Sequence, residues 1–256
     1  MRVFIAANPE TLGRRAAEEV GARLREAISR RGEARLVLST GLSQVETLAH
    51  LVKQPVDWSR VTVFHLDEYV GLPEDHPASF RRYLRERFFR WVSVREAVLI
   101  DGNARDLFRV VASLERAVRE KPIDVGLIGI GENAHIAFND PPADFVTQHA
   151  FHVVTLAEAC RQQQVSEGWF ATRDEVPPTA ISMTPYQILQ CGAIVSAVPH
   201  EAKARAVYQT LTHEESPEVP ATFLRRHPQW SLYLDTASAS LIDAELRQRY
   251  GVQWVS

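Results

Sequence analysis

Short apolar segments alternate with amphipathic segments along almost the whole chain. Apolar runs typical of buried strands occupy residues 3–6, 36–38, 61–66, 98–100, 125–130, 153–156, 193–198 and 231–234. Segments with helical spacing or helix-start signals lie between them, at about 9–30, 44–52, 79–91, 107–119, 158–170, 185–189, 202–211 and 238–250. This alternation predicts an α/β fold with a mostly parallel sheet and helices on both faces.

The first helical segment illustrates the pattern. Leu12, Ala16, Val20 and Leu24 recur at four-residue steps, and Asn8-Pro9 supplies a cap and an initial proline. In open parallel sheets, ligands bind beyond the carboxyl ends of the strands. We therefore expect the functional residues in the segments that leave those ends, at 39–44, 67–76, 131–140 and 199–203.

Length and charge restrict the alternatives. The chain has 256 residues, no low-complexity linker and no internal repeat, so a single domain over 1–256 is expected. Its net charge of −3 and the lack of a Lys/Arg block argue against a nucleic-acid partner. No apolar run is long enough to span a membrane. Cys160 and Cys191 lie far apart and fit no metal-ligand spacing, which favours a reducing, cytoplasmic location and no metal.

The strand at 125–130 leads into a histidine and a carboxylate. His135 and Asp140 follow a glycine-bearing turn, and an imidazole beside a carboxylate can move protons at neutral pH. The alternatives without a functional role are a histidine buried in the core and an aspartate in a turn. Gly129 to Ala134 also matches the G-x-G-x-x-A dinucleotide fingerprint. That match is expected to be a decoy, because it lies mid-chain and Pro141-Pro142 stops any nearby helix.

Two further segments carry candidate chemistry. Asp67-Glu68 directly follows the strand at 61–66, where it is part of a site, a helix cap or a surface turn. The residues Ser39, Thr40, Gly41 and Ser43 lie between a strand and a helix, where hydroxyls and backbone N–H groups can hold a phosphate. The alternative for this second segment is an ordinary turn with Ser43 as the N-cap.

Lys203 lies just inside the helical segment at 202–211. A lysine near a helix start opposes the helix dipole unless an anion is nearby. It is therefore either an anion-binding residue or a solvated surface lysine.

Two long motifs resemble one family. Residues 66–80, which read LDEYVGLPEDHPASF, resemble the signature of the glucosamine-6-phosphate deaminase family, and Gly129 to Asp140 resembles its second motif. The related 6-phosphogluconolactonases usually differ at Phe138-Asn139-Asp140-Pro141. The likeness extends from about Arg2 to Leu241.

The resemblance implies a Rossmann-like fold and conversion of glucosamine 6-phosphate and water to fructose 6-phosphate and ammonia, without an organic cofactor. It implies that Asp67 is the general base, that His135 helps to open the sugar ring, and that Asp140 orients and charges the histidine. Asn133 is implied to be a hydrogen-bonding positioner. Lys203 and the segment from Ser39 to Ser43 are implied to bind the phosphate of the small-molecule substrate.

Several alternatives remain open at this point. These are a 6-phosphogluconolactonase, a deaminase for galactosamine 6-phosphate, and a non-catalytic sugar-phosphate sensor. The sensor is suggested by the loop, which reads Gly41-Leu42-Ser43-Gln44, and by Asn133, which cannot act as a base. Ala134 also replaces the usual glycine and should resist a positive φ. The sequence also leaves open whether copies of the chain form a homo-oligomer.

Overall fold

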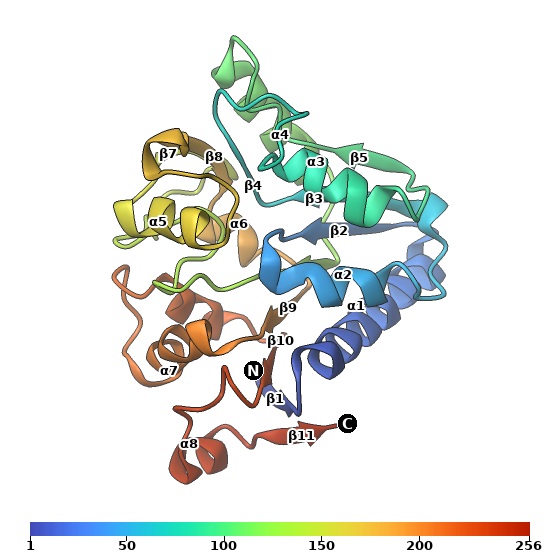
Figure 1. The fold of residues 1–256 in the computed structure, drawn as a ribbon. Coiled ribbons are helices and arrows are strands. Elements are labelled where there is room, and N and C mark those ends of the chain that lie inside the picture. Colours follow the sequence, from blue (N-terminus) through green and yellow to red (C-terminus); the bar gives the residue numbers. More distant parts are fainter.

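The computed structural model describes all residues from Met1 to Ser256 and contains two sheets. The main sheet has eight strands in the order β11-β1-β10-β9-β6-β2-β3-β5, and each neighbouring pair is parallel (Figure 1). Its strands are β1 (Arg2–Ala6), β2 (Ala34–Leu38), β3 (Val61–His65), β5 (Glu96–Val98), β6 (Val125–Leu127), β9 (Ala193–Val198), β10 (Trp230–Asp235) and β11 (Gln253–Val255). The predicted α/β fold class is confirmed.

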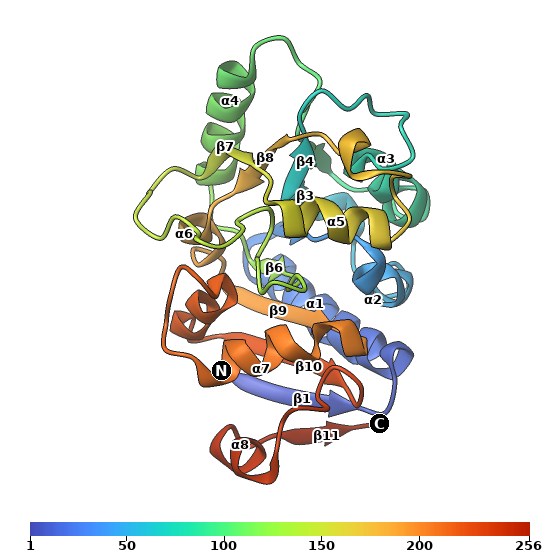
Figure 2. The same ribbon diagram turned by 60° about the vertical axis from the view of Figure 1, so that its left-hand side comes forward.

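Helices cover both faces of this sheet. Leu36 and Leu38 pack in a core with α1 (Pro9–Arg31), α2 (Val45–Leu51) and α3 (Phe80–Leu84), whereas Val37 faces the opposite core. The opposite core includes residues of α4 (Leu107–Arg119), α6 (Pro185–Ile188), α7 (Ala204–Thr212) and α8 (Ala244–Arg249). Figure 2 shows α7 in front of the strands and α1 behind them. Because strand side chains alternate between faces, both faces of each central strand are buried.

A second sheet has three antiparallel strands in the order β4-β8-β7. They are β4 (Asp67–Tyr69), β8 (Thr179–Met183) and β7 (Phe151–Thr155). Only Leu66 separates β3 from β4, and its carbonyl accepts a hydrogen bond from Met183 N at 2.7 Å. An aromatic cluster that includes Tyr69, Phe138 and Phe170 joins this sheet to α5 (Glu158–Ser166). The second sheet therefore holds α5 close to the end of β3.

Several predicted boundaries were wrong. The strand predicted at 98–100 is β5, which ends at Val98, and the one predicted at 125–130 pairs as β6 only to Leu127. The helix predicted at 238–250 is helical only over α8, because Ser238 and Asp235 exchange hydrogen bonds that close a turn instead. The predicted helix at 79–91 changes from α3 to a π-helical turn at Arg85–Phe89.

Three strands were missed, namely β4, β8 and β11. The three residues of β4 include Asp67 and Glu68, a composition that reads as a turn. The three residues of β11 form an edge with mostly exposed side chains. Their partners lie far away in the sequence, so no local pattern marks them.

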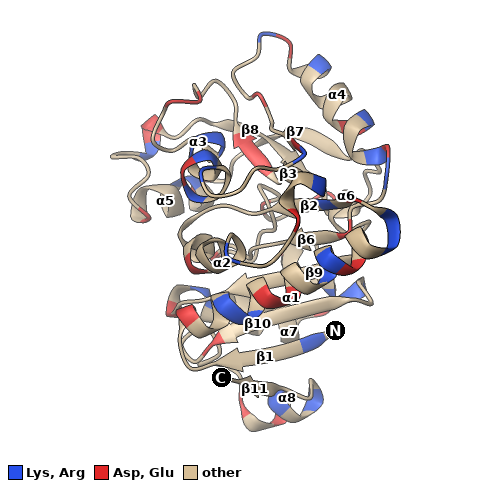
Figure 3. Ribbon diagram, turned by 90° about the vertical axis from the view of Figure 1, so that its right-hand side faces the viewer, with Lys and Arg blue, Asp and Glu red and all other residues tan.

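Charged side chains are paired along the surface rather than gathered on one face. On α1, Arg14 and Arg15 contact Glu18, and Arg23 contacts Glu19, so positive and negative side chains alternate along the helix (Figure 3). None of the helices combines the length and apolar character needed to cross a membrane.

Candidate active site

A cleft with about 550 Å³ of empty space opens among the carboxyl ends of β2, β3, β6 and β9. The lining residues are Ser39, Thr40, Gly41, Ser43, Leu66, Asp67, Phe80, Gly129, Ile130, Gly131, His135, Ala137, Phe138, Gln163, Gln164, Glu167 and Lys203. The structure thus brings together most of the residues singled out in the sequence.

Asp67 reaches the cleft from the junction between β3 and β4. Its side chain is buried, with the residue 7% exposed. Burial, together with the neighbouring charge of Glu68, raises the pKa of Asp67 to about 8, against a smaller opposing effect from the Phe138 N–H. A carboxyl group with a pKa this close to neutrality is suited to take up and release a proton during a reaction.

Glu68 has a structural role. Its carboxylate accepts hydrogen bonds from Ser79 Oγ at 2.9 Å and from Arg81 N at 2.9 Å, at the start of α3. It also accepts from Phe80 N and Tyr69 N. The helix-cap interpretation therefore applies to Glu68, while Asp67 alone of this pair lines the cleft.

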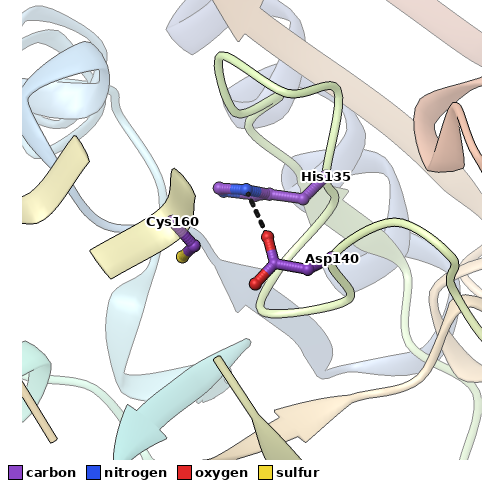
Figure 4. Close-up of side chains that lie close together, drawn as sticks. All are labelled: His135, Asp140 and Cys160. Atoms are coloured by element: carbon purple, nitrogen blue, oxygen red, sulfur yellow. Dashed lines mark ion pairs between the residues drawn. The ribbon is translucent and has the colours of Figure 1, made fainter. Parts of the chain in front are cut away.

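His135 and Asp140 lie on one loop and face each other (Figure 4). The distance from His135 Nδ1 to Asp140 Oδ1 is 3.2 Å. Asn133 Nδ2 donates to the same carboxylate oxygen at 2.9 Å, and Asn133 Oδ1 accepts from His135 N at 3.2 Å. Asn133 and Asp140 do not line the cleft, so they act on a ligand only through His135.

The carboxylate of Asp140 is set up to stay ionised. Burial by itself would raise the pKa of Asp140. Three neighbours outweigh this effect and lower the pKa, namely the imidazole of His135, the amide of Asn133 and the Ala157 N–H, which donates to Asp140 at 3.0 Å. The ionised carboxylate lies beside Nδ1 on one side of the imidazole and orients the ring. The other side of the ring faces the cleft, so His135 can exchange a proton with a bound ligand.

Close approach of the backbone explains a glycine in this loop. A Cβ atom added to Gly131 would lie 2.2 Å from Cε1 of the His135 ring, so only glycine leaves room for the imidazole. No helix follows Gly131; the chain turns, with Ala134 N donating to Gly131 O at 3.0 Å. The dinucleotide fingerprint is therefore a decoy, as predicted from Pro141-Pro142.

Ala134 adopts the conformation that its side chain resists, with φ at 64°. Its carbonyl accepts a hydrogen bond from Ala221 N at 2.9 Å, and its methyl group is buried in the core. Tertiary contacts thus hold Ala134 where a glycine would be relaxed, and the turn that presents His135 keeps its shape.

One group of side chains resembles a metal site. Ligand atoms of His135, Asp140 and Cys160 lie within 4.8 Å of one another (Figure 4). Burial and the charge of Asp140 raise the pKa of the Cys160 thiol well above its usual value. The thiolate is the form that binds metals. The environment of Cys160 disfavours the thiolate, so the arrangement fits a protonated thiol beside a carboxylate better than a metal centre.

The cleft lining also includes Ser39, Thr40, Gly41, Ser43 and Lys203, and we refer to this part of the lining as the distal end. Lys203 is 6% exposed, and its ammonium group forms no ion pair with the protein. Burial lowers its pKa, while the charges of Glu167 and Glu132 oppose this. Ser39 Oγ is also buried without a hydrogen-bond partner. Buried groups left unpaired at a cleft wall are available to a ligand.

Ser43 does not cap a helix. The turn Leu42–Gln44 has no side-chain cap, and Ser43 Oγ instead accepts a hydrogen bond from Gln44 Nε2 at 3.0 Å. Lys203 ends a 3₁₀ turn, Glu201–Lys203, and so precedes α7 rather than lying inside it. The alternatives of an N-cap for Ser43 and a solvated surface position for Lys203 are both wrong.

Sequence reasoning missed the contribution of α5 to the cleft. The cleft is also lined by Gln163 and Gln164 from this helix and by Glu167 just after it. Gln164 Oε1 accepts from the Tyr69 hydroxyl at 2.8 Å, and Gln163 Oε1 accepts from Glu132 N at 3.3 Å. The available signal was the run of glutamines at 162–164 within a helical segment, which places buried amides where apolar residues would otherwise pack.

Comparison with known proteins places this geometry in context. Residues 7–232 match the family described as glucosamine-6-phosphate isomerases/6-phosphogluconolactonase. A glucosamine-6-phosphate deaminase of Thermoanaerobacter pseudethanolicus is 34% identical over 97% of this chain and 98% of its own length. A glucosamine-6-phosphate deaminase of Lactobacillus delbrueckii subsp. bulgaricus is 32% identical over 94% of this chain and 100% of its own length.

Solved structures agree with this match. A glucosamine-6-phosphate deaminase described as monomeric superposes with a TM-score of 0.86 at 31% identity, covering 94% of this chain and 100% of its own. The 6-phosphogluconolactonase of Trypanosoma brucei superposes with a TM-score of 0.76 at 17% identity, covering 94% and 98% of the two chains. At that identity the second likeness shows a shared fold alone.

Proposed function

The chain belongs to the glucosamine-6-phosphate isomerase/6-phosphogluconolactonase family, and from this we propose that it is an enzyme that converts glucosamine 6-phosphate and water to fructose 6-phosphate and ammonia. The observation that carries the proposal is one cleft that presents a carboxyl group with a near-neutral pKa, Asp67, and an imidazole backed by a carboxylate, His135 with Asp140.

The reaction first requires an open sugar ring. Opening removes a proton from the anomeric hydroxyl and supplies one to the ring oxygen, and His135 relays these protons. Asp140 supports the charged imidazolium during the transfer, and Asn133 keeps the carboxylate in place through its 2.9 Å hydrogen bond.

Proton transfer between two carbons follows. Asp67 removes the proton from C2 of the open-chain sugar and returns it to C1. The C1 carbonyl oxygen gains a proton and the amine at C2 loses one, so that C1 carries a hydroxyl and the C2–N bond becomes an imine. Water then adds to C2, and the C–N bond breaks to release ammonia and leave the ketose. A fixed base of this kind typically contributes about 10²–10⁴-fold to the rate.

The phosphate of the substrate is placed at the distal end of the cleft. The unpaired ammonium of Lys203 and the hydroxyl of Ser39 are available there, and the segment from Ser39 to Ser43 lines the same wall. Holding the phosphate at this end fixes the reacting carbons near Asp67 and His135.

Substitution of Asp67 by asparagine tests this assignment. Asp67→Asn keeps the shape of the side chain but removes the base, so turnover of glucosamine 6-phosphate is expected to fall at least about 10²-fold. Ammonia release is measured for both proteins, with circular dichroism as the check that the fold is intact. A variant with wild-type turnover would refute the role of Asp67.

Parallel assays separate the related activities. Galactosamine 6-phosphate tests the epimer at C4, and 6-phosphogluconolactone tests hydrolysis without deamination. Ammonia release with glucosamine 6-phosphate, faster than the other two reactions, is the expected result. We also propose a cytoplasmic location, because Cys160 and Cys191 are both free thiols.

A further inference from the structure

We propose that Gln164 is a specificity-determining residue whose side-chain amide donates a hydrogen bond to the hydroxyl oxygen on C4 of the sugar phosphate. Glucosamine 6-phosphate and galactosamine 6-phosphate differ in the orientation of this hydroxyl, so Gln164 sets the preference between them. This inference rests on the proposed function for the class of substrate, and it concerns how the cleft recognises the middle of the sugar.

The amide of Gln164 is buried at the cleft and retains a free donor. The residue is 6% exposed and lines the cleft. Its Oε1 accepts from the Tyr69 hydroxyl at 2.8 Å, whereas its Nε2 donates to no group of the protein. Gln163 differs, because its Nε2 donates to Glu167 at 2.7 Å and its Oε1 accepts from Glu132 N at 3.3 Å. Of the two amides, that of Gln164 keeps both N–H groups for a ligand.

Tyr69 fixes the direction in which this amide points. Tyr69 is 0% exposed, and burial raises the pKa of its hydroxyl well above the usual value, so the hydroxyl keeps its proton. That proton needs an acceptor, and Gln164 Oε1 is the acceptor that the structure provides. Exchanging the two ends of the amide would leave the buried proton unpaired. Oε1 therefore stays on Tyr69, and Nε2 is left for the cleft.

Aromatic rings surround this part of the cleft. The ring of Tyr69 lies 5.1 Å from that of Phe80 and 5.2 Å from that of Phe138, and both phenylalanines line the cleft. Rings of this kind offer the Nε2 group no strong acceptor. A hydrogen bond from Gln164 to a ligand oxygen is therefore stronger here than at an open surface.

The position of Gln164 along α5 indicates which oxygen it meets. Cys160, Gln164 and Glu167 recur at the spacing of one helix face. The sulfur of Cys160 lies within 4.8 Å of a ring nitrogen of His135 (Figure 4). Glu167 Oε2 lies 4.0 Å from the position that a Cβ atom on Gly41 would occupy.

The helix rise converts this spacing into a position on the sugar. At about 1.5 Å per residue, Gln164 lies about 6 Å along the axis from Cys160 and about 4.5 Å from Glu167. In the proposed placement, C1 and C2 react at the His135 end, and the phosphate on C6 lies at the Gly41 end. Gln164 therefore faces the carbons between them, on the side of C4.

Binding of three unreactive ligands tests the proposal. They are the amino alcohol obtained by reducing glucosamine 6-phosphate, its epimer at C4, and its derivative without the C4 hydroxyl. None has a carbonyl group, so none can isomerise. Each is titrated calorimetrically into the wild-type chain, Gln164→Met and Gln162→Met. Gln162 is a matched control, because it is an exposed glutamine on the same helix and does not line the cleft.

Gln164→Met is expected to bind the first amino alcohol about tenfold more weakly than the wild-type chain, and the epimer and the deoxy derivative within about twofold of it. Gln162→Met should match the wild-type chain with all three ligands. In turnover, the preference of Gln164→Met for glucosamine 6-phosphate over galactosamine 6-phosphate, as the ratio of kcat/KM values, should fall by the same factor. A merely structural role would weaken all three ligands alike.

A second variant covers loss of folding. Gln164→Met leaves the buried Tyr69 hydroxyl without an acceptor, whereas Tyr69→Phe combined with Gln164→Met replaces both partners by apolar groups of similar shape. The double variant should show the same selective loss of affinity for the first amino alcohol.

The proposal is overturned if the folded variants bind all three ligands with unchanged affinity, or if they lose affinity for all three by one factor. Failure of the proposed function has a different signature. In that case the wild-type chain releases no ammonia from glucosamine 6-phosphate, while the titrations, which require no turnover, still show whether the C4 hydroxyl is recognised through Gln164.

Discussion

At the scale of single residues, the cleft depends on carboxyl groups that share a residue type but differ in environment. Asp67 is buried beside Glu68, and its pKa is raised to about 8. Asp140 is also buried, yet the groups around it lower its pKa. The environment thus separates a carboxyl group that can exchange protons from one that stays charged.

The raised pKa of Asp67 predicts how activity depends on pH. Since Asp67 must lose its proton to act as a base, kcat/KM for glucosamine 6-phosphate should rise with pH up to about 8. The charge of Glu68 contributes to this raised pKa, so Glu68→Gln should move the acidic limb of the profile down by about one pH unit.

A second variant serves as the control for this pH profile. Glu74→Gln also removes a carboxylate near Arg81, but Glu74 does not contribute to the raised pKa of Asp67. Its profile should coincide with that of the wild-type chain. Ionisation of the substrate is common to all three proteins, so an identical limb in Glu68→Gln would contradict the role given to Glu68.

At the scale of elements, the turn between β9 and α7 positions Lys203 at a cost in backbone strain. His200 has φ at 80° and ψ at 146°, a region almost restricted to glycine. The backbone N–H of His200 donates a hydrogen bond to Asp235 Oδ1 at 3.2 Å, which holds the turn in this conformation. The 3₁₀ turn Glu201–Lys203 follows directly and carries Lys203 into the cleft.

Replacing His200 by glycine should relieve this strain. The side chain is exposed, so His200→Gly loses little packing, and the free energy of unfolding should rise by about 1 kcal/mol. His213 is a matched control, because it is exposed and has φ at −71°. His213→Gly should lower stability by about 0.5–1 kcal/mol. Urea unfolding measures both changes, and equal effects of the two variants would contradict the assignment of strain.

At the scale of the whole molecule, the raised pKa of Asp67 predicts a pH dependence of stability. Between the usual value of 3.8 and about 8, the folded chain retains a proton that the unfolded chain has released, so ionisation opposes folding. Stability relative to Asp67→Asn should therefore fall as pH rises through this window, by at most about 1.4 kcal/mol per pH unit, and level off above it.

Thermal unfolding of the two proteins from pH 5 to pH 9 measures this difference. Other shifted groups, such as Asp140 with its lowered pKa, are present in both proteins and cancel in the comparison. A stability difference that stays constant over the whole range would show that Asp67 titrates near its usual value.

The sequence by itself determined the layered α/β architecture and the position of the cleft. Strand and helix periodicities are local, and residues at the carboxyl ends of parallel strands meet at one edge of a sheet. Asp67, His135 and Lys203 could therefore be selected from their positions after predicted strands, and the structure places all three on the same cleft.

Only the tertiary structure decided how these groups are supported and what surrounds them. The strands β4 and β8 pair across more than a hundred residues, and they bring Gln164 and Glu167 to the cleft together with α5. The separate roles of Asp67 and Glu68, and the positive φ of Ala134, also follow from contacts with distant segments. Burial, pKa and charge balance depend on such non-local packing, which no local residue pattern encodes.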